Sequence, residues 1–278
     1  MTTRIITDSS ANFYDKTILG VDHVSVPLSL EVDGKTWLDD ENLDQGQFLL
    51  ALKETTERST SSCPNINAWL DAYEGADEIF VITITSALSG SYNAAVQAAK
   101  MYHEKNPKAK ILVFDSRSAG PQLQLLATKI AQLVNKKFSF EEIVKEAENY
   151  QHHIGLVFVL KELANLANNG RVTPAVAKIA DLLKLNVIGT ANNKGEFELL
   201  GKARGIKKAE AKMLKDMIKN GYIGGRVQID HVQNLDGAKH FKNLIVSKFP
   251  NAEVNIGECG ALCSFYAENG GLMVGYEK

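Results

Sequence analysis

The stretch that most constrains the fold of this 278-residue chain covers residues 77–98. Residues 79–85 form an almost unbroken apolar and β-branched run, which is typical of a strand buried on both faces of a sheet. Serines, a glycine and an asparagine follow in residues 86–93, and the alanine-rich residues 94–101 predict a helix. Open α/β sheets often bind anions at such a turn, because the first N–H groups of the helix are unpaired. Each serine alone could equally be a helix cap or turn former.

The order of the predicted elements favours an α/β fold, because strand and helix patterns alternate from end to end. The pattern changes near residue 150, and a hairpin signal at residues 192–195 adds antiparallel pairing to the second half. We therefore predict two lobes. Residues 1–150 form a mainly parallel sheet flanked by helices, and residues 151–278 form a mixed sheet with helices.

Charge and composition exclude several classes of partner. Lys and Arg number 31 against 33 Asp and Glu, so the net charge of -2 gives no reason to expect nucleic acid or an anionic membrane surface. The first residues carry no signal-peptide pattern, and no apolar run is long enough to span a bilayer. Three cysteines are too few for a disulfide scaffold. These features predict a cytoplasmic protein with no integral membrane segment.

Polar clusters follow other predicted elements and are candidates for the same cleft. Residues 7–10 end a short strand, and residues 59–65 form a hydroxyl-rich loop between two helical patterns. Residues 24–32 predict one edge strand that turns back through a hairpin into residues 35–38. We interpret the acids at residues 39–41 as favouring the dipole of the helix that follows them, so no metal site is predicted.

Tests for familiar catalytic motifs are negative. The chain has no G-x-x-x-x-G-K-[ST], no G-x-G-x-x-G after a strand, and Ser89 does not lie in G-x-S-x-G. Only His231, beside Asp230, could meet a nucleophile such as Cys63 across the fold, and such a pair is more often core packing. A hydrolase or acyltransferase that uses Cys63 or Ser89 stays an alternative without an identified general base. A third reading is an interaction protein that docks through the lysine stripe at residues 208–219.

Several short motifs, in this order, resemble the DegV family over nearly the whole chain, as a single unit of residues 3–277. The N-terminal matches are Ile6-Thr7-Asp8-Ser9, Val26-Pro27-Leu28, Ser61-Ser62-Cys63-Pro64, Leu88-Ser89-Gly90-Ser91-Tyr92 and Asp115-Ser116. The later matches are Asn169-Gly170-Arg171, Lys202-Ala203-Arg204-Gly205 and Asp230-His231. Tyr266 stands where the family often has a histidine, and Leu185-Asn186-Val187 stands for its Ile-Lys-Pro.

The resemblance implies a protein that is not an enzyme and that binds one long-chain fatty acid, such as palmitate, in a slot between the lobes. By the family pattern, Ser61 and Ser89 hold the carboxylate, Arg204 adds positive charge, and Ser62 and Gly90 lie beside them. No metal or cofactor is expected beyond the bound acid. In some members the acid is presented to a separate fatty acid kinase, which is therefore a possible partner. We expect apolar residues of the second lobe to line the slot, with these candidates: Phe158, Leu160, Leu163, Leu166 and Ile188.

Overall fold

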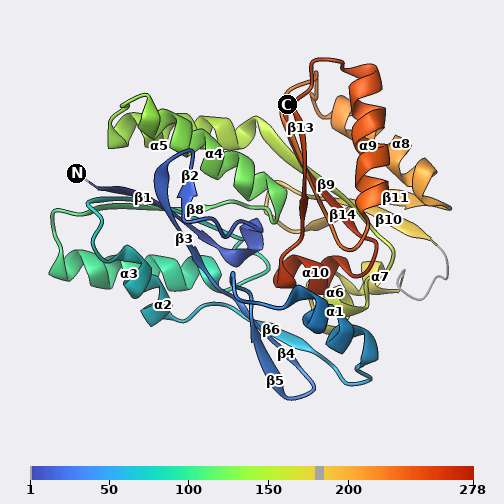
Figure 1. Cartoon of the computed structure of the whole chain (residues 1–278), viewed down its shortest axis with the longest axis horizontal. Helices are drawn as coiled ribbons and strands as arrows, with labels where there is room; N and C mark the ends of the chain where they lie inside the picture. The colour runs from blue at the N-terminus through green and yellow to red at the C-terminus, as the bar shows by residue number, and fades with distance from the viewer. Residues whose placement is uncertain (1, 179–184) are drawn as a thin grey trace.

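The computed structural model describes residues 2–178 and 185–278, and these form three sheets with helices packed around them (Figure 1). The first sheet has the order β2-β3-β1-β7-β8. Its strands are β1 (Thr3–Asp8), β2 (Thr17–Ile18), β3 (Val21–Val26), β7 (Glu78–Thr83) and β8 (Lys110–Asp115). All pairs in it are parallel except β2 with β3. The buried strand and the following helix predicted from residues 77–98 are therefore confirmed as β7 and α3 (Ser91–Lys105).

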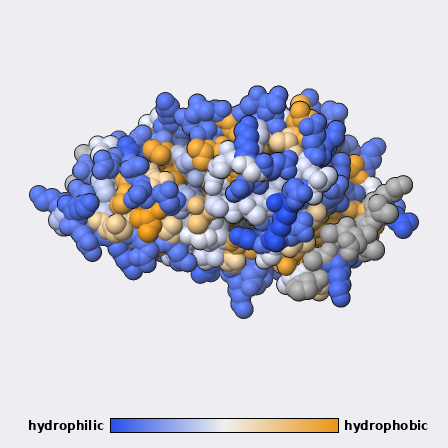
Figure 2. Space-filling view, turned by 90° about the horizontal axis from the view of Figure 1, so that it is seen from below, coloured by the Kyte–Doolittle hydropathy of each residue, from blue (hydrophilic) through white to orange (hydrophobic). Residues whose placement is uncertain are grey.

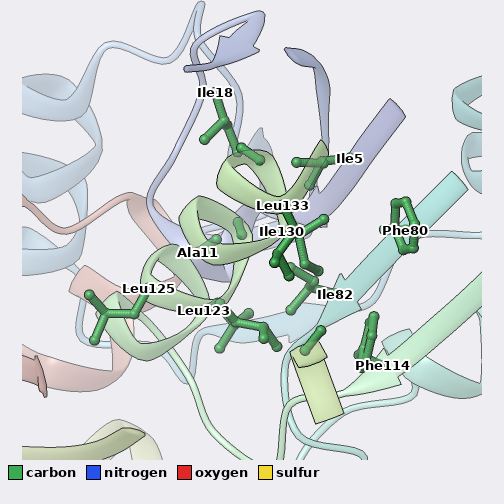
Figure 3. Close-up of a cluster of buried hydrophobic side chains, with 14 of the residues drawn as sticks. Ile5, Ala11, Ile18, Phe80, Ile82, Phe114, Leu123, Leu125, Ile130 and Leu133 are labelled. Carbon is green, nitrogen blue, oxygen red and sulfur yellow. The ribbon is translucent and has the colours of Figure 1, made fainter. Parts of the chain in front are cut away.

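Helices cover both faces of this sheet. On one face, α2 (Ile66–Tyr73) and α3 pack against the buried side chains of Ile6, Ile79 and Val81. On the other face lie α4 (Pro121–Asn135) and α5 (Phe140–His152), and Figure 3 shows the contact of α4 with the strands. In that view Leu123, Ile130 and Leu133 of α4 point toward Ile5, Phe80 and Ile82. Alternate residues of the strands thus enter two separate cores, as strands buried on both faces require.

The second sheet is built by the later half of the chain and has the order β11-β10-β9-β14-β12-β13. Its strands are β9 (Ile154–Leu160), β10 (Asn186–Ala191), β11 (Phe197–Ala203), β12 (Val227–His231), β13 (Val254–Glu258) and β14 (Leu272–Glu277). Only β12 and β13 are parallel, so the sheet is mixed as predicted. Helices α8 (Ile206–Lys219) and α9 (Leu235–Lys248) bury one of its faces, while α4 touches strands of both sheets.

A third, smaller sheet lies below the other two in Figure 1 and has the order β5-β4-β6. Its strands are β4 (Ser29–Val32), β5 (Lys35–Leu38) and β6 (Thr60–Ser62). The remaining elements are the 3-10 turn η1 (Ser9–Ala11) and the helices α1 (Gln45–Glu54), α6 (Ala164–Asn168), α7 (Pro174–Ala177) and α10 (Ala261–Ala267). Phe48 of α1 and Phe265 of α10 share a buried cluster with Leu30 of β4.

Two predictions about elements are wrong, and some short elements were not predicted. The single strand predicted for residues 24–32 is broken at Pro27, which has no N–H to continue a ladder, so β3 stays in the first sheet and β4 begins the third. The predicted loop 59–65 contains β6, and α10 was not predicted at all. The helix predicted for residues 175–183 is described only as α7, because residues 179–184 lie outside the described residues.

The two-lobed α/β class agrees with the prediction, since the strands of the first two sheets come from separate halves of the chain. The boundary predicted at residue 150 falls inside α5, just before β9 opens the second sheet. Within the described residues, no helix is both long and apolar enough to cross a membrane. Figure 2 shows one face of the molecule, on which small apolar groups lie between hydrophilic residues.

Candidate functional site

A cavity of about 330 Å³ lies between the two large sheets and the small one. Such a volume falls within the range of small-molecule sites, roughly 300–1,000 Å³. Most of its wall is apolar and comes from widely separated parts of the chain: Leu28, Ile84, Leu156, Phe158, Leu160, Leu166, Phe197, Leu262 and Met273. The cavity thus exists only when both halves of the chain are folded together.

Hydroxyl groups gather on the part of the wall formed by two loops. Ser61 and Ser62 end β6, and Ser89 and Gly90 form the turn before α3. The Ser89 hydroxyl oxygen accepts a hydrogen bond from the backbone N–H of Ser91 (3.2 Å). Four of the five residues predicted to bind the ligand are therefore brought together at one cavity, and their roles toward a ligand stay predictions.

Gly90 allows these two loops to come close to each other. A Cβ atom built on Gly90 would lie 3.1 Å from the Sγ atom of Cys63, which is closer than ordinary van der Waals contact. Cys63 itself is exposed and also lines the cavity. A side chain at position 90 would therefore force the Cys63 thiol to rotate or to shift by a few tenths of an ångström.

Tyr266 completes the polar part of the wall. It lies on α10, lines the cavity, and its hydroxyl is 2.7 Å from the Ser61 hydroxyl oxygen. Either hydroxyl can donate in this hydrogen bond, and when Tyr266 donates, the single proton of the Ser61 hydroxyl is free for a ligand oxygen. Tyr266 thus makes a polar contact with a cavity serine.

Asp8 anchors the serine turn through hydrogen bonds on both sides of it. Its carboxylate is fully buried and accepts hydrogen bonds from the Ile84 N–H (2.9 Å), the Ser91 hydroxyl (2.6 Å) and the Ser10 hydroxyl (2.5 Å). Burial raises the pKa of Asp8 to about 6. The polar end of β1 therefore joins β7 to the start of α3, which explains why polar residues follow neighbouring parallel strands here.

Asp39 holds the helix that carries Tyr266. Its carboxylate is fully buried and accepts hydrogen bonds from the N–H groups of Ala261 (2.6 Å) and Leu262 (3.1 Å) and from the Tyr14 hydroxyl (2.7 Å). The prediction that this acid serves the dipole of the helix after it is wrong for Asp39. Asp39 satisfies the first N–H groups of α10, which lies more than 200 residues further along the chain.

The two arginines of the matched motifs lie in different places. Arg204, which was predicted to add positive charge to the site, is exposed directly after β11 and does not belong to the described lining of the cavity. Arg171 does line the cavity, and its Nε–H donates to the carbonyl oxygen of Leu88 (3.0 Å), one residue before Ser89. The motif Asn169-Gly170-Arg171 pointed to this residue, but no role was assigned to it from the sequence.

Three of the five predicted apolar lining residues do line the cavity, namely Phe158, Leu160 and Leu166. The other two are fully buried: Leu163 lies in the same cluster as these three, and Ile188 lies in the core under α8 and α9. Side chains of β9 point alternately to its two faces, which explains why Phe158 and Leu160 share the cavity side while Val159 packs under α8 and α9.

Few groups in the cavity could act as an acid, base or metal ligand. The described lining contains no histidine, and its one carboxylate is Glu196. His231, which we considered as a partner of Cys63, lies near the backbone N–H of Asn234 (3.4 Å) and does not belong to that lining. Burial raises the pKa of Cys263 well above its usual value, which favours the neutral thiol. Across the described chain, no group of three His, Cys, Asp or Glu residues could hold a metal ion.

The lysine stripe of the third reading lies on α8, away from the cavity. Lys208, Lys215 and Lys219 are exposed there, whereas Lys212 is half-buried and pairs with Asp216 (3.5 Å). Its three exposed members match an ordinary solvated helix face.

A family model, described as "Uncharacterised protein, DegV family", matches residues 2–278. The chain belongs to the DegV family. A DegV domain-containing protein of Streptococcus pyogenes serotype M3 is 41% identical over 279 residues, which cover 100% of both chains. The family assignment made from the ordered motifs is thus confirmed.

Solved DegV structures share this fold throughout. The DegV family protein from Eubacterium eligens, loaded with heptadecanoic acid, has a TM-score of 0.96 and 38% identity and covers 99% of each chain. The Fatty Acid Kinase (Fak) B3 protein of Streptococcus pneumoniae, loaded with linoleic acid, has a TM-score of 0.96 and 40% identity, over 100% of this chain and 99% of that one. A DegV protein from Ruminococcus gnavus, refined with vaccenic acid, has a TM-score of 0.92 and 31% identity over 99% of each chain.

Proposed function

We propose that this chain binds one long-chain fatty acid in the cavity between its lobes, with the carboxylate among Ser61, Ser89 and Tyr266. The observation that carries the proposal is the chemistry of the cavity: apolar side chains form most of the wall, and hydroxyl groups gather in one part of it. A long alkyl tail with one terminal carboxylate matches that distribution.

The tail would supply most of the affinity. About fourteen methylenes at about 0.8 kcal/mol each give on the order of 11 kcal/mol as an upper bound, before the cost of association is subtracted. The carboxylate would lose much of that gain if it were buried without partners, because an unpaired buried charge is costly. The hydroxyls of Ser61 and Ser89 and the guanidinium of Arg171 supply donors in the cavity wall.

The relatives support the same ligand class. Proteins 31–40% identical to this chain have been crystallised with heptadecanoic, linoleic and vaccenic acids, and their folds match it with TM-scores of 0.92–0.96. These acids differ in length and unsaturation. The ligand of this chain is accordingly proposed as a class, with palmitate as one member.

A test begins with native mass spectrometry of the purified chain, followed by solvent extraction of the bound lipid. We expect an excess mass that extracts as a free fatty acid. Ser89→Ala should weaken binding of added palmitate about tenfold or more, because it removes a hydrogen bond to a charged group. Ser247→Ala, which changes an exposed serine of α9, is the matched control and should bind as the parent does. A chain that stays free of lipid with every acid offered would contradict the proposal.

We also propose that the chain acts with a fatty acid kinase as a binding partner that carries no catalytic group itself. The S. pneumoniae relative is named as a Fatty Acid Kinase B3 protein, and the described cavity wall here offers no histidine to activate Cys63 or Ser89. No cofactor is proposed beyond the acid. A cytoplasmic location fits the three free cysteines.

The alternative, a hydrolase or acyltransferase, makes the opposite prediction for Cys63→Ala. Under the binding proposal, this variant retains palmitate as the parent does and no ester or acyl donor is turned over by either chain. Turnover by the parent that Cys63→Ala abolishes would favour the enzyme.

A further inference from the structure

The first sheet ends at β8, which pairs with β7 and with no other strand of the described chain. At the start of β8, the Lys110 N–H donates to the carbonyl oxygen of Asp77 (2.9 Å). The backbone groups of Lys110 therefore face β7. Alternate residues of a parallel strand bond to the same neighbour, so the N–H and C=O groups of Ile111 and Val113 point away from β7. An edge of this kind is a template for another strand.

This edge lies in a groove rather than on a flat surface. Helices α3 and α5 cover opposite faces of the sheet, and the groove of about 990 Å³ between them has β8 along it. Ile111, Leu112 and Val113 are all half-buried and line the groove. Natural sheets often guard an edge with charged residues, but in β8 the two charged residues, Lys110 and Asp115, stand at the first and last positions. The centre of the edge stays apolar.

The two walls of the groove differ in chemistry. The α3 wall carries Lys100 and His103, and Lys108 lies in the turn before β8. The α5 wall presents Phe140 and Val144. The α3 wall thus combines these cationic groups with apolar Val96 and Ala99, and the α5 wall is apolar apart from Glu141.

The groove retains an excess of positive charge. Glu141 is the one acid among the described groove residues, and its carboxylate already pairs with the Lys110 ammonium (2.7 Å). That leaves Lys100, Lys108 and, when protonated, His103 to attract negative charge. The open edge of β8 favours an extended peptide, and the unpaired cationic groups favour acidic side chains on it.

We propose that the groove along β8 binds an extended segment of a partner protein, which joins the sheet as a strand and alternates acidic with apolar side chains. Successive side chains of a strand point to opposite faces, so one set would meet the basic α3 wall and the other the apolar α5 wall. A second copy of this chain fits less well, because two β8 strands meeting on a two-fold axis would bring Lys100 and Lys108 of both copies into one interface.

The test uses the full ¹⁵N-labelled chain and a blocked heptapeptide that alternates glutamate with valine. With saturating peptide, we expect amide hydrogen exchange at Ile111 and Val113 to slow at least tenfold, since their N–H groups gain partners. The same peptide with lysine in place of glutamate should not bind. Unchanged exchange at both amides, or equal binding of the lysine peptide, would overturn the proposal.

Two variants separate charge from backbone pairing. Lys100→Glu with Lys108→Glu should weaken the glutamate peptide at least tenfold, whereas Lys215→Glu with Lys219→Glu on α8 should leave its affinity unchanged. Val113→Pro removes one outward N–H and should abolish binding, while circular dichroism checks that the sheet remains folded. A dimer that forms with concentration and that Val113→Pro abolishes would overturn the partner and assign the groove to self-association.

Discussion

At the scale of single residues, the polar part of the cavity depends on hydrogen bonds that link distant positions. Ser61 and Tyr266 are 205 residues apart in sequence, yet their hydroxyls are 2.7 Å apart. The resemblance to the family pointed to Ser61 and Ser89 because both lie in short motifs that match the family pattern, and both line the cavity. The same resemblance assigned the positive charge to Arg204, whereas Arg171 lines the cavity. A sequence motif gives the order of residues but not which side chains reach the cavity.

Tyr266→Phe should weaken binding of palmitate about five- to tenfold. The change removes the hydroxyl that orients Ser61, and one hydrogen bond contributes about 1 kcal/mol. Isothermal titration calorimetry with the delipidated chain measures the effect. Tyr222→Phe is the control, because the Tyr222 hydroxyl donates to the carbonyl oxygen of Gly225 and its ring lies in the core under α8 and α9, away from the cavity. Equal losses in both variants would mean that Tyr266 only stabilises the fold.

Asp230 should make stability depend on pH. It is fully buried among three amide donors, Asn12 (2.7 Å), Gln124 (2.8 Å) and Gln228 (2.8 Å), and burial raises its pKa to about 7. A carboxyl with a raised pKa binds its proton more tightly in the folded state, so its contribution to the free energy of unfolding falls as the pH rises from about 4 to about 7.

Asp230→Asn removes that contribution. The free energy of unfolding of the variant, relative to the parent, should therefore rise by up to about 3 kcal/mol between pH 5 and pH 8, whatever the offset from altered hydrogen bonds. Urea unfolding at several pH values measures it. Asp71→Asn, at an exposed site of α2, should show no such trend. A difference that is flat with pH would contradict the raised pKa of Asp230.

At the scale of elements, the long regular strands and helices were predictable, whereas two short elements of the cavity wall were not. The apolar composition of residues 79–85 and 154–160 is enough to predict buried strands. The spacing of Ser139 and Glu142 predicts the capping box at the start of α5. In contrast, β6 consists of three hydroxyl residues, Thr60–Ser62, and α10 is buried on nearly all sides, so neither shows an alternation of apolar and polar residues. Both belong to the cavity wall, and tertiary contacts fix them.

Asp39→Asn should loosen α10. One carboxylate serves the N–H groups of Ala261 and Leu262, and an amide in its place directs donors at them, so we expect a loss of about 1–3 kcal/mol. Thermal unfolding measures the loss, and hydrogen exchange should quicken in α10 before other helices. Asp40→Asn, whose carboxylate meets the exposed N–H of Asn42, is the control. Uniform exchange across all helices would argue against a local role.

At the scale of the whole molecule, the cavity is a product of how the two sheets meet. The turn between β10 and β11 reaches the first lobe, where a Cβ atom on Gly195 would lie 2.0 Å from the Thr85 hydroxyl oxygen and 2.9 Å from the Arg117 Cα. Sequence patterns predicted the hairpin and both lobes. They could not predict this contact, because nothing local in the sequence specifies which surfaces of two folded halves touch.

Gly195→Ala should push that hairpin from the first lobe and speed the dissociation of palmitate several-fold. Gly75→Ala is a close control, because Gly195 (φ +80°) and Gly75 (φ +81°) have the same backbone conformation while nothing lies within 4 Å of a Cβ on Gly75. Both variants therefore have similar backbone strain. Stopped-flow displacement of a fluorescent fatty acid compares their dissociation rates. Equal rates would show that the hairpin contact does not retain the ligand.

The cavity walls have a consequence for the lifetime of the protein in a cell. Leu28, Leu156 and Leu262 come from three distant parts of the chain and face one space, so an alkyl chain there would act as a missing core side chain. A ligand that binds only the folded state stabilises it by RT ln(1 + [L]/Kd), about 2.7 kcal/mol at a hundredfold excess over Kd. Proteases that degrade unfolded chains would then remove the empty protein first, and the supply of lipid would set its abundance.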